Sequence, residues 1–153
     1  TQSWTDPEHP SCIAPGKRPR LTPMPALALS DGRPAFALGT PGGDVQPQAM
    51  LQAFLNAVVF GMDPQSAVEA PRFVTRSFPD SFSPHNNQPG RLNLEGRIAR
   101  ETGDALASLG HRVEWWPDRT SRVGGVCLLD IDAETGILHT GADCRRAAYP
   151  LGW

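Results

Sequence analysis

Two short apolar runs separated by a turn signal constrain the fold of this chain more than any other feature. Ala26-Leu27-Ala28-Leu29 and Ala35-Phe36-Ala37-Leu38 flank Ser30-Asp31-Gly32-Arg33, a pattern that predicts a β-hairpin with glycine at a positive φ angle. Both runs are apolar at nearly every position, so we expect both strands to be buried on both faces. Such a hairpin needs other layers to cover it.

A glycine-rich loop, residues 39–44 (Gly-Thr-Pro-Gly-Gly-Asp), joins this hairpin to a predicted helix. The helix is indicated by an apolar stripe, with Pro47 in the first turn and Gly61 at the stop: Met50, Leu51, Phe54, Leu55, Val58 and Val59. The consecutive glycines allow backbone N–H groups to approach an anion or a developing oxyanion closely. The alternative is a tight turn that needs left-handed residues, and the local pattern alone favours it.

The remaining periodicity predicts a mixture of strands and helices. Asp63 suits an N-cap, with Pro64 opening a short helix that ends near Ala70 before Pro71. Further strands are expected at 72–75, 91–95, 112–116, 123–131 and 137–140, with a helix at 98–109 and a polar loop at 77–90. This order predicts an α+β sandwich with largely antiparallel pairing. We expect residues 1–25, which hold six prolines, to form an extended segment, and residues 26–153 to form the folded portion.

Composition excludes several classes of partner. The chain has 14 Lys and Arg against 16 Asp and Glu, and its only basic run, residues 17–20, is too short for nucleic acid binding. No stretch approaches the roughly 18 apolar residues of a membrane helix. Cys12, Cys127 and Cys144 are odd in number and widely spaced, so reduced thiols are expected, although a single bridge stays open. The compartment, cytoplasmic or periplasmic, also stays open.

Neither a metal site nor a cofactor is expected. His9 and Cys12 form an isolated pair, whereas a metal site normally needs three or four ligands. Cys144 lies beside Arg145 and Arg146, which would favour a reactive thiolate, but a structural cysteine is the stronger interpretation. The chain also lacks the Gly-x-Ser-x-Gly sequence of the usual serine-hydrolase elbow.

Several sequence blocks, taken together, resemble the small subunit of the gamma-glutamyltranspeptidase family. The resemblance runs from about Pro15 to the end of the chain, with compatible order and spacing. The blocks that carry it are residues 15–19 (Pro-Gly-Lys-Arg-Pro), 39–43, 60–63 (Phe-Gly-Met-Asp), 70–73 (Ala-Pro-Arg-Phe), 110–113 (Gly-His-Arg-Val) and 141–146 (Gly-Ala-Asp-Cys-Arg-Arg).

The resemblance implies part of a four-layer αββα sandwich of the N-terminal-nucleophile (Ntn) hydrolase type, made by autocleavage of a precursor. In this family the new N-terminal Thr attacks a γ-glutamyl amide, with its own α-amine as base. Gly42 and Gly43 match the pair whose N–H groups form the oxyanion hole. Leu21 and Thr22 match two adjacent hydroxyl residues that contact substrate.

Two of the matched positions depart from the family pattern. Leu21 cannot form a side-chain hydrogen bond, so one substrate contact is missing while Thr22 keeps the other. Asp44 stands where family members often have Ser, which brings a negative charge near the predicted substrate site. Both departures argue against strict γ-glutamyl specificity and leave the acyl-transfer machinery plausible.

The nucleophile is expected upstream of this chain. Thr1 begins a segment that is neither apolar nor strand-like, whereas the family's nucleophile opens a buried strand, so Thr1 is not expected to be catalytic. The expected partners are the large subunit, which carries the substrate-gripping Arg, the N-terminal part of the small subunit and a small γ-glutamyl substrate; a homo-oligomer stays open. The alternative function is a non-catalytic scaffold or binding module, or an inactive fragment of the family.

Overall fold

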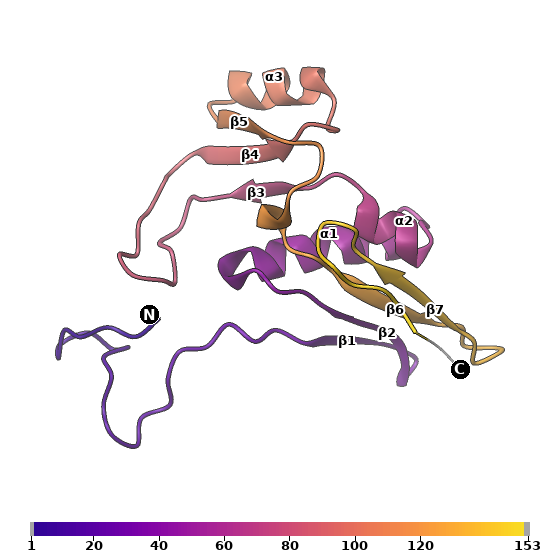
Figure 1. Cartoon of the computed structure of the whole chain (residues 1–153), viewed down its shortest axis with the longest axis horizontal. Helices are drawn as coiled ribbons and strands as arrows, with labels where there is room; N and C mark the ends of the chain where they lie inside the picture. Colours follow the sequence, from indigo (N-terminus) through magenta and orange to yellow (C-terminus); the bar gives the residue numbers. More distant parts are fainter. Residues whose placement is uncertain (1, 152–153) are drawn as a thin grey trace.

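Two helices lie between two β-sheets in the computed structural model, which describes residues 2–151 (Figure 1). The first sheet has the order β1-β2-β6-β7 and is antiparallel throughout. Its strands are β1 (Ala26–Ser30), β2 (Arg33–Gly39), β6 (Cys127–Ile131) and β7 (Leu138–Ala142). The second sheet has the order β3 (Phe73–Thr75), β4 (Arg91–Glu95) and β5 (Arg112–Trp116), and only β4 and β5 are parallel. The prediction of an α+β fold with largely antiparallel pairing is confirmed.

The predicted hairpin is formed by β1 and β2. Asp31 (φ 50°) and Gly32 (φ 77°) are the two turn residues between paired Ser30 and Arg33, as in a type I′ turn. The expectation that both strands are buried on both faces is wrong for this chain, because Leu27 is 61% and Leu29 59% exposed. The helices cover only one face of the four-stranded sheet, and no segment among residues 2–151 covers the whole of its opposite face.

The main hydrophobic core lies where α1 (Gln46–Val58) and α2 (Pro64–Glu69) meet the four-stranded sheet. Its buried members are Leu38, Val45, Ala49, Met50, Ala53, Val68, Val74, Val123, Val126 and Leu128. Asp63 caps α2 as expected, its side chain accepting a hydrogen bond from the N–H of Ser66 at 3.0 Å. None of the helices within residues 2–151 is long and apolar enough to cross a bilayer.

Helix α1 also runs along the edge of the three-stranded sheet. The Gln48 side chain both donates to and accepts from the backbone of Thr75, and the Gln52 side chain does the same with Phe73. On the other helix, Gln65 pairs in the same way with Ala142 of edge strand β7. Three glutamine amides therefore satisfy the backbone groups that edge strands leave unpaired.

Some element boundaries differ from the sequence-based expectation. The strand expected at 123–131 begins only at Cys127, because Ser121–Val123 form a short 3-10 turn and Gly124 has a φ of 89°. Helix α3 (Arg100–Ser108) is shorter than expected and packs on β5, where Gly103 leaves room for the Trp115 ring. The final strand, β7, is shifted to Leu138–Ala142.

Residues 2–25 contact the loop between β3 and β4 through Trp4, which stacks on His85, and through Arg20, which donates to Ser81; much of the segment runs away from that loop (Figure 1). The Trp4 ring is stacked between the imidazoles of His9 and His85, with ring centroids 3.8 and 3.9 Å away. This segment contains no helix, and its only strand-like contact is an isolated bridge between Trp4 and Cys12. Stacking and side-chain hydrogen bonds therefore hold its described part in place.

Candidate active site

The glycine loop after β2 presents two backbone N–H groups at the start of a helix. Gly42 has a φ of 140° and Gly43 a φ of 59°, conformations that side chains rarely allow. Gly43–Val45 form a 3-10 turn, closed by the Val45 N–H on the Gly42 carbonyl at 3.2 Å, and α1 follows directly. Within residues 2–151 neither glycine N–H donates a hydrogen bond to another protein group. Both are therefore available to an acceptor on a ligand.

A second glycine pair holds one side of this loop. The Thr40 hydroxyl accepts from the Gly125 N–H at 2.8 Å and donates to the Pro41 carbonyl at 2.9 Å. A Cβ added at Gly124 would lie 2.8 Å from the Thr40 oxygen, so only glycine permits this close approach. The loop is thus fixed before any ligand arrives, as oxyanion stabilisation requires.

The other side of the loop is held by the β3–β4 loop. The Asp44 carboxylate accepts from the Ser81 N–H at 2.6 Å and from the Ser81 hydroxyl, and Arg20 donates to that hydroxyl oxygen at 2.6 Å. Ser81 is almost fully buried. Beside it, the Phe82 ring packs so closely that a Cβ on Gly43 would lie 2.8 Å from it. Asp44 is therefore engaged by the protein itself.

One cleft of about 320 Å³ collects most of the predicted site residues. Leu21, Thr22, Gly43 and Asp44 all line it, and Gly42 is the chain neighbour of Gly43. Leu21 is 66% exposed, and the half-buried Thr22 accepts a hydrogen bond from the Gln2 side chain at 3.2 Å. The geometry brings these residues together, while their catalytic and binding roles remain predictions.

Sequence reasoning missed the residues that bind the loop from outside. Ser81 and Phe82 lie in the segment interpreted only as a polar loop, and Arg20 lies in the segment interpreted as extended coil. No periodicity or motif links these positions; Arg20 and Ser81, which contact each other, are 61 residues apart in the sequence. Only the three-dimensional arrangement could reveal them.

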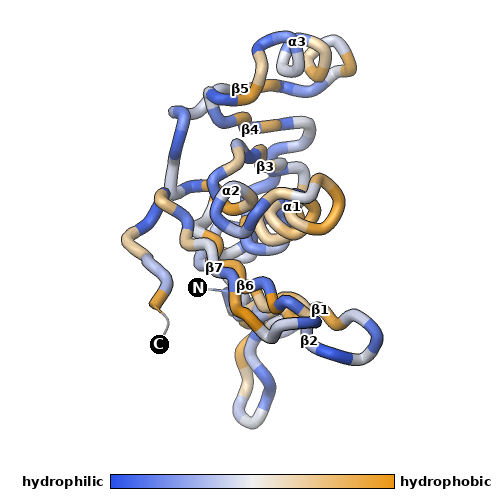
Figure 2. The backbone as a smooth tube through the Cα atoms, turned by 90° about the vertical axis from the view of Figure 1, so that its right-hand side faces the viewer, coloured by the Kyte–Doolittle hydropathy of each residue, from blue (hydrophilic) through white to orange (hydrophobic). Residues whose placement is uncertain are grey.

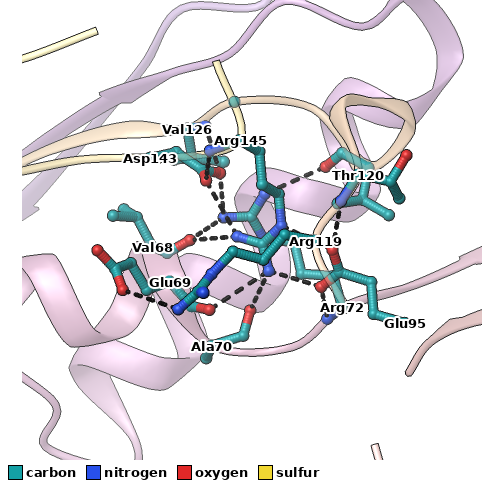
Figure 3. A network of polar contacts seen from close by, with 12 residues as sticks. Val68, Glu69, Ala70, Arg72, Glu95, Arg119, Thr120, Val126, Asp143 and Arg145 are labelled. Atoms are coloured by element: carbon teal, nitrogen blue, oxygen red, sulfur yellow. Dashed lines mark hydrogen bonds and ion pairs between the residues drawn. The ribbon is translucent and has the colours of Figure 1, made fainter. Parts of the chain in front are cut away.

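Two of the sequence blocks that carry the family resemblance meet in a buried ionic cluster (Figure 3). Arg72 pairs with Asp143 at 2.7 Å, and Arg145 contacts Asp143 at 3.0 Å and Glu95 at 2.5 and 2.7 Å. All four side chains are at most 1% exposed. Arg145 also donates to the carbonyls of Val68 and Ala70 at the end of α2, so the cluster ties β4, β7 and α2 together.

Burial and charge pairing oppose each other in this cluster. Burial lowers the pKa of Arg72, which the neighbouring Asp143 carboxylate only partly offsets. Burial would raise the pKa of Asp143, but the charges and hydrogen bonds of Arg72 and Arg145 together outweigh it, and the pKa falls below its ordinary value. Burial would likewise lower the pKa of Arg145, but its hydrogen bonds to Glu95 and ion pair with Asp143 raise it. The opposite charges of Arg72, Asp143 and Arg145 are thus paired within the fold, which fits a structural role for the cluster.

The remaining sequence candidates take no part in the cleft. Thr1 lies outside the described residues. His9 stacks on Trp4, and within residues 2–151 no three His, Cys, Asp or Glu side chains are placed to hold a metal ion. All three cysteines are free, and Arg145, which follows the exposed Cys144, directs its guanidinium into the buried cluster.

A four-stranded antiparallel sheet leads through a glycine loop into covering helices, and similar solved structures share this arrangement, so the chain is part of an Ntn hydrolase sandwich. The chain belongs to the gamma-glutamyltranspeptidase family, whose model matches residues 1–153.

Individual relatives agree with this membership. The chain is 33% identical to a glutathione hydrolase-like YwrD proenzyme of Bacillus subtilis, over 96% of this chain and 27% of that protein. It is 41% identical to an acylase ACY 1 proenzyme of a Pseudomonas species, over 88% of this chain and 21% of that protein. The solved structure of LmbA2991HD is similar with a TM-score of 0.85 and 37% identity, over 94% of this chain and 25% of that chain. The chain thus spans about a quarter of the length of the relatives it matches.

Proposed function

We propose that this chain supplies the oxyanion hole and part of the acyl-binding wall of an amide-cleaving or acyl-transferring enzyme. The supporting observation is the cleft lined by Gly43, Leu21 and Thr22, beside which Gly42 and Gly43 carry N–H groups that donate to no group of the described residues. The nucleophile is contributed by another part of the precursor, as family membership implies.

The geometry of the glycine loop suits the charge that develops during amide cleavage. When a nucleophile adds to the carbonyl carbon of the substrate amide, the carbonyl oxygen becomes negatively charged. It then accepts hydrogen bonds from the N–H groups of Gly42 and Gly43. The N-terminal end of α1 adds a favourable dipole at the same place. Because Thr40, Gly125 and Ser81 already fix the loop, little reorganisation is needed in the transition state.

The lining of the cleft favours an acyl group with few polar contacts near Leu21. Thr22 offers one hydroxyl, whereas Leu21 offers only apolar surface. The relatives include both a glutathione hydrolase-like protein and an acylase. We therefore propose γ-glutamyl or related acyl amides as substrates, with less dependence on the polar groups of the γ-glutamyl moiety than strict transpeptidases show.

The remainder of the precursor is the proposed partner. The uncovered face of the four-stranded sheet is apolar at Leu27, Ala37, Leu129 and Leu138, which share that face by strand register. The sheet is covered by helices only on the opposite side (Figures 1 and 2). A second apolar layer from the same precursor would bury this face, as in the αββα arrangement of the family.

The direct test measures amine release from a γ-glutamyl anilide by the protein encoded by the whole gene. Gly42→Ala should lower kcat about 10²- to 10³-fold, because a side chain there forces the loop from its φ of 140° and displaces an oxyanion donor. Gly136→Ala is the matched control, since Gly136 also has a positive φ (73°) but lies in an open turn away from the cleft.

Equal activity of the Gly42→Ala and Gly136→Ala variants would contradict the oxyanion assignment. If the complete protein folds but neither cleaves itself nor releases amine from γ-glutamyl or other acyl anilides, the non-catalytic scaffold is the correct interpretation.

A further inference from the structure

A second cavity, of about 380 Å³, lies beside the candidate active-site cleft. The two share Asp44 and Phe78 in their linings. The second cavity is also lined by three arginines: Arg76 after β3, Arg91 on β4 and Arg122 in the 3-10 turn before β6. Its size is adequate for a small organic ligand.

The arginines of this cavity are not equally neutralised. Arg91 forms an ion pair with Glu114. Across residues 2–151, by contrast, neither Arg76 nor Arg122 forms a salt bridge. Two guanidinium groups without carboxylate partners therefore border one cavity.

The cavity is also lined by two carboxylates, Asp44 and Asp80, which would favour a cation unless protein groups already bind them. Asp44 accepts two hydrogen bonds from Ser81, whose hydroxyl oxygen in turn accepts one from Arg20. Asp80 accepts from the Phe82 N–H at 2.9 Å, which leaves it as the less engaged of the two acids. The remaining balance favours an anionic ligand group, since guanidinium groups bind carboxylates in a planar, bidentate fashion.

The lining also contains buried polar atoms that have no protein partner. The Nε of Arg91 and the Oδ1 of Asn93 are both buried and unpaired in the described part of the chain. The amide nitrogen of Asn93 donates to the Glu114 carboxylate at 3.3 Å, which fixes the orientation of the amide and leaves its oxygen without a hydrogen-bond donor. Buried groups of this kind mark places where a ligand or ordered water completes the hydrogen bonding.

Two further lining side chains are apolar and flat, while Asn86 and Gln88 add polar amides. Trp116 and Phe78 lie in the cavity wall, and the Arg122 guanidinium is 5.8 Å from the Trp116 ring centroid. We propose that this cavity binds the carboxylate of a small ligand with a flat, apolar body through the guanidinium groups of Arg76 and Arg122. Trp116 and Phe78 pack against the body of that ligand.

The position of the cavity identifies the part of a substrate that would occupy it. Asp44 and Phe78 line both this cavity and the cleft at Gly43, so a bound amide with its carbonyl at the glycine loop can extend its amine side into the neighbouring cavity. This step rests on the proposed function and assigns the cavity to a carboxylate-bearing amine leaving group.

Binding is tested first without catalysis, in the protein encoded by the whole gene. Benzoate and the neutral benzamide have the same ring, and their dissociation constants are measured by NMR from the Trp116 indole N–H signal, assigned with Trp116→Phe. Benzoate should bind about tenfold more tightly than benzamide, and Arg76→Gln or Arg122→Gln should each weaken benzoate binding about tenfold. Arg33→Gln, an exposed change on the β1–β2 hairpin, should leave it unchanged.

Equal affinity for benzoate and benzamide, absence of binding, or loss of binding in Arg33→Gln to the same extent would overturn the proposal. Circular dichroism checks that each variant is folded. The exposed Arg122 provides a second variant should Arg76→Gln disturb the half-buried β3 end.

Catalysis then tests the substrate assignment separately. With γ-glutamyl anilides that carry or lack a ring carboxylate, Arg76→Gln should raise KM about tenfold only for the carboxylated one and leave kcat unchanged. An equal effect on both would overturn the leaving-group assignment. If the wild-type protein turns over neither anilide, the proposed function fails, and the benzoate measurement alone decides whether the cavity is a carboxylate site.

Discussion

Arg145 and Arg146 are neighbours in sequence but lie in opposite environments. The Arg145 side chain is buried with two carboxylates and several carbonyl oxygens, whereas the side chain of exposed Arg146 donates to the Ser121 carbonyl. Arg145→Lys should lower the free energy of unfolding by about 3 kcal/mol, because lysine cannot replace the two-pronged contact with Glu95. Arg146→Lys should change it by less than about 0.5 kcal/mol. Denaturant unfolding of both variants checks this, and similar losses would contradict the cluster's assigned role.

Asp143 should make stability depend on acid pH. Burial would raise its pKa, but the charges and hydrogen bonds of Arg72 and Arg145 together outweigh burial, so its pKa is lowered in the folded protein. Its stabilising contribution is therefore complete above the ordinary aspartate pKa, about 3.9, and is lost as pH falls through the lower folded pKa. Asp143→Asn should be less stable than the wild type at pH 7, and the difference should shrink below about pH 4. Urea unfolding across pH checks this, and a constant difference would exclude the assignment.

The sequence predicted site residues only where a local pattern or a family block marked them. Gly42 and Gly43 were marked by their place between a strand and a helix and by the family resemblance, and Leu21 and Thr22 by the resemblance alone; Leu21, Thr22 and Gly43 line one cleft, and Gly42 adjoins it. Ser81 could not be predicted, because it contacts Asp44 across 37 residues through an irregular loop. Such contacts depend on tertiary folding and leave no periodic trace.

At the scale of elements, the three glutamines that bind edge strands are the feature that helix periodicity does not predict. Gln48 and Gln52 are four residues apart, one helical turn, and reach alternate residues Phe73 and Thr75 of β3. Their spacing matches the strand residues whose backbone groups face outward from the sheet. Periodicity predicted α1 and, to within one residue, β3, but not the contact between them.

The glutamine contacts should protect the β3 amides from solvent exchange. The double substitution Gln48→Ala and Gln52→Ala leaves the N–H groups of Phe73 and Thr75 without their acceptors. Their hydrogen exchange should accelerate about tenfold or more, whereas amides in the centre of β6 should be unaffected. Unchanged exchange at Phe73 and Thr75 would show that the contacts contribute nothing to the edge.

Close packing between β7 and α2 should make one strand glycine irreplaceable. A Cβ at Gly141 would lie 2.3 Å from the Pro64 carbonyl oxygen, a backbone atom that cannot move alone. Gly141→Ala should destabilise the protein by about 1–3 kcal/mol by forcing the helix from the sheet. Gly39→Ala in β2 is the control, because nothing lies within 4 Å of its added methyl. Thermal unfolding compares the two, and equal midpoints would contradict this packing.

At the scale of the whole molecule, the apolar hairpin sequence predicts that both faces are buried, and this chain buries only one of them. The sequence indicated burial on both faces, and the helices α1 and α2 cover one. Leu27, at 61% exposure, and Leu138, at 58%, lie on the uncovered face of the sheet. A pattern of apolar residues records the environment of the complete assembly, so it cannot show which chain segment supplies the covering layer.

The uncovered face should therefore control association. Exposed apolar patches of this kind drive proteins together, so the 153-residue chain produced alone should sediment as dimers or larger species. The double substitution Leu27→Ser and Leu138→Ser should shift the chain toward the monomer. Leu109→Ser removes an exposed leucine at the end of α3, away from this face, and should not. Analytical ultracentrifugation distinguishes these outcomes. Co-production with the remaining precursor should suppress self-association of the unsubstituted chain, because the precursor then covers the apolar face of the sheet. Continued self-association would show that the precursor does not cover this face.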